Sequence, residues 1–140
     1  MSLDNQNRAE MIRLHIEKVH QNLADADLLY DSGSISAATG RLYYSVFHAV
    51  HALFIANGIV AKTHHGMNHQ FNDRFVKTGL FDPIFGRLIA RLENMREKAE
   101  YDVVFTISRD QYEAIKPTAI ELIEQIEKNI SDSAFGIDMQ

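Results

Sequence analysis

Residues 34–57 read SISAATGRLYYSVFHAVHALFIAN, and this stretch decides the fold class. Its apolar side chains recur every three or four residues along two separate stripes, which is the spacing of an α-helix. The first stripe is Ile35, Ala38, Leu42, Ser45, Ala49, Ala52 and Ala56, and the second is Tyr43, Val46, Phe47, Val50, Leu53 and Phe54. Such a helix is apolar most of the way round, so it belongs at the centre of a bundle or in a subunit interface.

Helices are also predicted on both sides of this stretch. Residues 8–30 carry one apolar stripe, and Gly33 suits the left-handed position that follows a helix. After the stop signal Asn57-Gly58, a short third helix begins at Thr63 and ends at Thr78-Gly79.

Two further start signals lie in the second half of the chain. Asp82-Pro83 has the form of an N-cap followed by proline at the first helical position. Ser108 and Gln111 resemble a capping box that opens a last helix. Pro117 is expected to kink that helix, because proline lacks an N–H donor and crowds the preceding turn.

These patterns predict an all-α fold. The only alternating stretch, residues 103–107, is short and falls in a loop. We therefore expect an antiparallel bundle of four to five helices, with a short third helix and a kinked last helix. One domain over residues 1–130 and a frayed tail over 131–140 complete the prediction.

The composition excludes several classes of protein. The chain has 140 residues and no cysteine, which removes disulfides, thiol nucleophiles and Cys-based metal sites. Polar residues interrupt the most apolar stretch, 46–61, which is shorter than the ~20 residues of a membrane span. A cytoplasmic protein without a membrane segment is expected.

The net charge of −5 argues against a protein that coats nucleic acid non-specifically. The charge is uneven, however, because residues 62–98 contain seven basic and four acidic side chains. Arg96 lies beside the apolar stripe of its predicted helix rather than on the solvent face. Its guanidinium should meet a partner helix or a cleft, or form a half-buried salt bridge.

The seven histidines raise the question of a metal site. The pairs His65/His69 and His48/His51 have helical spacing, but no Glu-x-x-His motif accompanies them. We expect no metal and no cofactor, with these histidines serving in caps, hydrogen bonds or interfaces.

Several segments in order resemble one family. They are residues 36–38 and 41–50, Gly58, Lys62-Thr63-His64-x-Gly66, residues 75–79, and Arg96-x-x-x-x-Tyr101-Asp102. Over roughly residues 10–130 this succession is similar to the HEPN domain family (higher eukaryotes and prokaryotes nucleotide-binding). The resemblance implies an all-α homodimer, and many members are RNase toxins paired with a minimal nucleotidyltransferase antitoxin.

The catalytic signature of those RNases is an arginine followed, four to six residues later, by a histidine. By resemblance it falls on Arg96 and Tyr101, with Asp102 holding the loop. A base for RNA cleavage must accept a proton near neutral pH. Histidine, with a reference pKa of ~6.5, does so, whereas tyrosine at ~10 is ionised in about one molecule per thousand. The site is therefore predicted to be degenerate, with RNase activity weak or lost.

Further candidate residues for binding RNA or nucleotide share this resemblance or its chemistry: Arg41, Tyr44, His48, Lys62, His64 and His65. Arg41 and His48 also have the permitted spacing, on one face of the second helix. The leading hypothesis is an RNA- or nucleotide-binding protein in a toxin–antitoxin module. A dimeric protein-interaction module without a substrate and an active metal-independent endoribonuclease are the alternatives.

Overall fold

The computed structural model describes residues 5–61, 63–133 and 135, without the side chains of His64 and His65. Its elements are the helices α1 (Asn5–Asp31), α2 (Ile35–Ala56), α3 (His64–Phe71), α4 (Pro83–Tyr101) and α5 (Arg109–Ser131), with a π-helical segment, η1 (Asn72–Val76), directly after α3. The described residues form no strand, so the all-α prediction is confirmed. Among them, no helix is long and apolar enough to cross a membrane.

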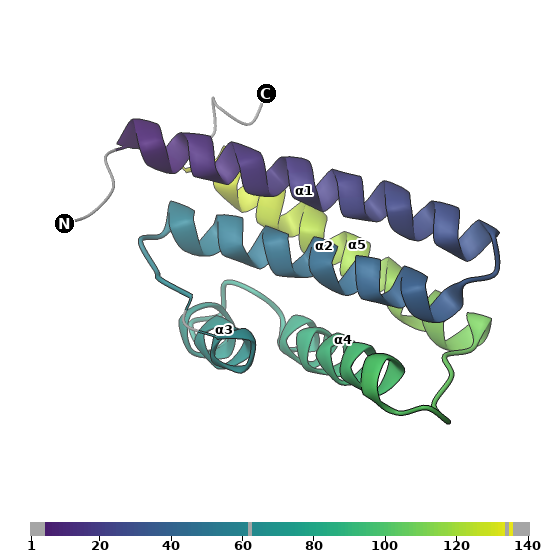
Figure 1. Ribbon diagram of the computed structural model, residues 1–140. Helices are drawn as coiled ribbons and strands as arrows, with labels where there is room; N and C mark the ends of the chain where they lie inside the picture. The colour runs from purple at the N-terminus through teal and green to yellow at the C-terminus, as the bar shows by residue number, and fades with distance from the viewer. Residues whose placement is uncertain (1–4, 62, 134, 136–140) are drawn as a thin grey trace.

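Helix α2 occupies the centre of the bundle (Figure 1), as its two apolar stripes predict. It packs against α1, α4 and α5. Figure 1 shows α1 and α2 running side by side, with α5 behind them and α3 and α4 below. The accessible part of α2 is a narrow strip that includes Gly40, Arg41, Tyr44 and His48.

The predicted helix starts are confirmed by their hydrogen bonds. Asp82 accepts from the backbone N–H of Ile84, with Pro83 at the first helical position. Ser108 and Gln111 form the reciprocal capping box at the start of α5. These caps fix the residues at which α4 and α5 begin.

Three features of the structure go beyond the sequence predictions. The third helix changes into a π-helical turn, which sets Asn72 so close to Gly86 of α4 that an added Cβ would lie 2.0 Å from the Asn72 side-chain oxygen. Pro117 lies inside α5 without ending it. Within the predicted tail, Phe135 is buried beneath the Arg8 guanidinium.

Candidate functional site

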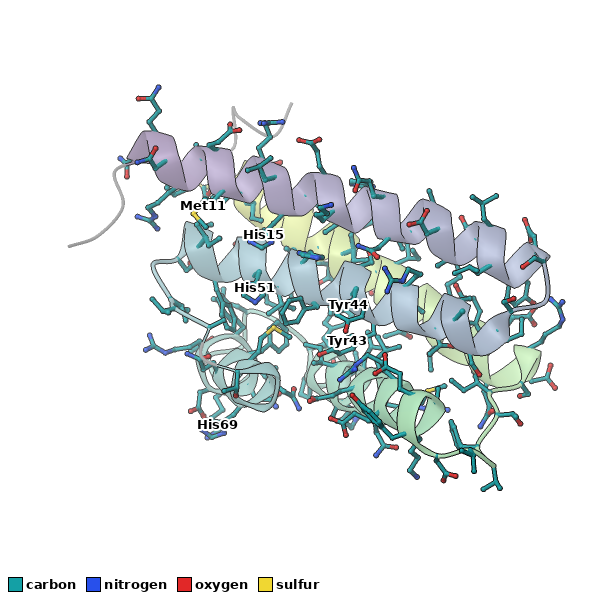
Figure 2. All side chains as sticks on the ribbon, in the orientation of Figure 1. Met11, His15, Tyr43, Tyr44, His51 and His69 are labelled. Atoms are coloured by element: carbon teal, nitrogen blue, oxygen red, sulfur yellow. The ribbon has the colours of Figure 1, made fainter. Side chains whose placement is uncertain are left out.

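Two guanidinium groups from different helices meet at one tyrosine. The guanidinium carbon of Arg41 lies 5.2 Å from the ring centre of Tyr44, and that of Arg96 lies 5.8 Å from the same ring. Arg96 also lies over Tyr43, at 4.9 Å. Figure 2 shows Tyr43 and Tyr44 in the region where α2 approaches α4. Helical packing of α2 on α4 thus brings together residues that are 55 positions apart in the sequence.

Arg96 is largely enclosed, with its side chain 11% exposed. Its guanidinium donates to Glu100 one turn later, at 2.9 Å, and lies 3.9 Å from Glu97. Burial lowers the pKa of Arg96, but Tyr44, Glu100 and Tyr43 outweigh that effect, so the pKa lies above its ordinary value. The buried Nε–H has no hydrogen-bond partner among the described residues. Arg96 is thus a largely enclosed positive charge held between α2 and α4.

A pocket of about 230 Å³ opens beside these groups. Its walls come from the end of α1, the first half of α2 and the last turns of α4: Leu29, Ser36, Ala37, Gly40, Arg41, Arg96, Ala99 and Glu100. Gly40 helps to keep it open, because an added Cβ there would meet no atom within 4 Å. Two arginines, a serine hydroxyl and small residues give the pocket the chemistry of an anion site.

Two buried residues with polar groups interact where α2 packs on α4. Glu93 is buried in α4, and it acts electrostatically on Tyr43 of α2. Burial and then the Glu93 carboxylate raise the pKa of Tyr43, whose hydroxyl therefore stays protonated at neutral pH. Neither residue is among the sequence-predicted site residues. The only signal for Glu93 is an acidic residue on the buried face of its helix, three positions before Arg96.

Tyr101 and Asp102 lie at the end of α4, away from the pocket lining. Tyr101 is 79% exposed. The Asp102 carboxylate accepts from the backbone N–H of Val104 at 3.1 Å, which shapes the loop after the helix. Val103 and Val104 in that loop are almost fully exposed. In one copy of the chain, the Tyr101 side chain therefore faces solvent.

His48 belongs to a separate cluster between α1 and α2. Its Nδ1 lies 3.0 Å from Nδ1 of His15, and the ring of His15 stacks on that of His51 at 5.2 Å. His15 and His51 are labelled where α1 and α2 approach each other in Figure 2. His15 and His48 border a groove of about 500 Å³ along α1. Arg41 and His48 thus share a helix face but line different pockets.

For the remaining predicted residues, Lys62, His64 and His65, the structure describes no side chain. Lys62 lies outside the described residues. His64 and His65 begin α3, where Thr63 caps the helix by accepting from the Gly66 N–H. Within the described part of the chain, no group of three or more His, Asp or Glu side chains is arranged to hold a metal ion.

Comparison with known proteins agrees with this fold. The model of the HEPN domain matches residues 12–129. The chain belongs to the HEPN domain family. Two similar proteins from Methanocaldococcus jannaschii, each named "Putative toxin", are 30% and 34% identical, over 94% and 70% of this chain and 97% and 67% of their own lengths. A protein of Thermotoga maritima named "UPF0332 protein" is 28% identical over 89% of this chain and 95% of its own length.

Proposed function

We propose that this HEPN protein binds RNA or a nucleotide through a phosphate group held by Arg41 and Arg96. The observation that carries the proposal is the pair of guanidiniums that converge on Tyr44 and line one pocket. Guanidinium groups suit phosphate because their donors match two of its oxygens at once. The pocket volume of about 230 Å³ suits one phosphate with part of a nucleoside, and the rest of an RNA strand would run over the surface.

The chemistry of the pocket favours binding over cleavage. Attack by a ribose 2′-hydroxyl requires a base beside the phosphate, and no histidine among the described side chains lines this pocket. Tyr101 takes the histidine position of the RNase members, so we propose that RNase activity is weak or lost. In that role Tyr101 would orient RNA by hydrogen bonding or stacking.

A protein partner is the second part of the proposal. The names of the Methanocaldococcus relatives support a toxin-like role, and the family resemblance supports a minimal nucleotidyltransferase as the matching antitoxin in the cytoplasm. A homodimer would cover the exposed apolar side chains at the end of α4, Val103 and Val104. It would also bring Tyr101 of each copy close to a second chain.

The same exposed loop favours one other function, a dimeric interaction module with no substrate. The two functions differ in whether the arginine pocket binds phosphate. Fluorescence anisotropy with a labelled eight-nucleotide single-stranded RNA at ~50 mM salt separates them. We use Arg96→Gln, which keeps much of the side chain over Tyr43, and Arg91→Ala, which removes an exposed charge from another face of α4.

Loss of a charge-assisted hydrogen bond of ~1.5–3 kcal/mol predicts that Arg96→Gln binds about ten-fold more weakly or worse. Arg91→Ala should stay within about two-fold of the wild type, because exposed charges distant from the ligand are screened. If both substitutions weaken RNA binding equally, the binding depends on the overall charge and not on the arginine pocket. No binding by the wild type would favour the interaction module.

A further inference from the structure

Glu100 forms an ion pair with Arg96, the same arginine that the proposed phosphate ligand needs. Its carboxylate accepts from the Arg96 guanidinium at 2.9 Å, and its side chain lines the same pocket as Arg41 and Arg96. Carboxylate and phosphate oxygens compete for the same N–H donors of an arginine. A phosphate that binds Arg96 from the pocket must therefore displace Glu100 or share the guanidinium with it.

The Glu100 side chain has room to move away from Arg96. The side chain is 44% exposed and lies in the last turn of α4, next to Tyr101. Arg96 is held independently of Glu100, because its guanidinium packs over the rings of Tyr43 and Tyr44. The carboxylate can thus rotate toward solvent while the arginine stays in place.

We propose that Glu100 is an internal competitor that sets the phosphate affinity of the Arg41–Arg96 pocket. The inference rests on the proposed function and adds a residue that weakens binding rather than supporting it. A phosphate that takes the guanidinium donor now paired with Glu100 must break this ion pair first. The cost of this step is consequently the same for a small phosphate ligand and for an RNA strand.

The neighbouring Glu97 provides a matched control. It lies 3.9 Å from Arg96, beyond hydrogen-bonding distance, and it is absent from the pocket lining. Its side chain is 39% exposed, close to that of Glu100. Glu97→Gln and Glu100→Gln therefore remove the same charge from the same helix end, but only the second removes the competitor.

The expected change in affinity in Glu100→Gln follows from the free energies of exposed ion pairs. These correspond to about a 1.5- to five-fold change. Glu100→Gln should bind more tightly by this factor, and the factor should be the same for 5′-AMP and for the eight-nucleotide RNA. A general charge effect would instead grow with the charge of the ligand. A positioning role for Glu100 would weaken binding.

Calorimetry with 5′-AMP and anisotropy with the labelled RNA measure both affinities for the wild type, Glu100→Gln and Glu97→Gln. The proposal expects a common gain in Glu100→Gln only, and no gain when Glu100→Gln is combined with Arg96→Gln. Unchanged or weaker binding by Glu100→Gln, with binding still sensitive to Arg96→Gln, overturns this inference alone. Binding that is insensitive to Arg96→Gln overturns the proposed function and this inference with it.

Discussion

Mild acid is expected to destabilise the fold through the histidines between α1 and α2. The Nδ1 atoms of His15 and His48 are 3.0 Å apart, a distance that allows one hydrogen bond and therefore one proton between them. Burial, followed by the charges of His15, His51 and Lys18, lowers the pKa of His48 to about 4. Burial also lowers the pKa of His15.

The sign of the effect follows from proton linkage. In the unfolded chain His48 takes up a proton as the pH falls through about 6.5, whereas in the folded protein it stays neutral down to about 4. The unfolded state therefore binds more protons between these values, and the free energy of unfolding falls as the pH is lowered across this window. His15 contributes with the same sign.

The magnitude can be worked for a change from pH 7.5 to pH 5, a range that lies above the carboxylate titrations. Between these two pH values, the lowered pKa of His48 corresponds by the linkage relation to a loss of about 2 kcal/mol in the free energy of unfolding. The ring is only half-buried, so we discount this to about 1 kcal/mol for solvent screening.

Urea unfolding followed by circular dichroism at several pH values measures this loss. His48→Gln keeps a polar side chain beside His15 and removes the titration, so its loss of stability should be smaller by about 1 kcal/mol. A His48→Gln variant whose stability falls with pH as steeply as that of the wild type would refute the assignment.

Three other substitutions test the remaining parts of the account. Tyr101→His should restore RNA cleavage if the site lacks only its base, as measured by gel assay with Tyr101→Phe as an inactive control; an inactive Tyr101→His counts against the preserved geometry. Ser108→Ala should cost about 1 kcal/mol in urea unfolding by removing the α5 cap, and no loss would mean that the capping box is dispensable. Leu92→Ala, in the fully buried face of α4, should cost ~2–5 kcal/mol, and a loss below 1 kcal/mol would contradict the packing of α4 on the core.

Local signals explain which parts of the fold were predictable from sequence. Asp82-Pro83 and Ser108 act within one helical turn, so a short stretch of sequence contains all the information that the cap requires. The burial of α2 follows from its own two stripes. The π-helical turn was not predictable in this way, because Asn72 acquires its position through a contact with Gly86 on another helix.

The candidate site was predictable only in part, for the same reason. Arg41, Tyr44 and Arg96 were identified singly, but their convergence depends on the packing of α2 against α4. The sequence analysis does not single out Glu100, because its place in the pocket depends on the three-dimensional arrangement. Tyr101 takes no part in this convergence, because its side chain is 79% exposed at the end of α4.

The central claim is that Arg41 and Arg96 contact phosphate, and the salt dependence of RNA binding tests it most directly. Each phosphate contact with a single strand contributes about −0.7 to the slope of log K against log salt concentration. Because the two arginines hold one phosphate, the account predicts that the slope becomes shallower by about this amount in the Arg41→Gln/Arg96→Gln double variant, while Arg91→Ala leaves it unchanged. A slope that is identical in the wild type and in the double variant would contradict the account.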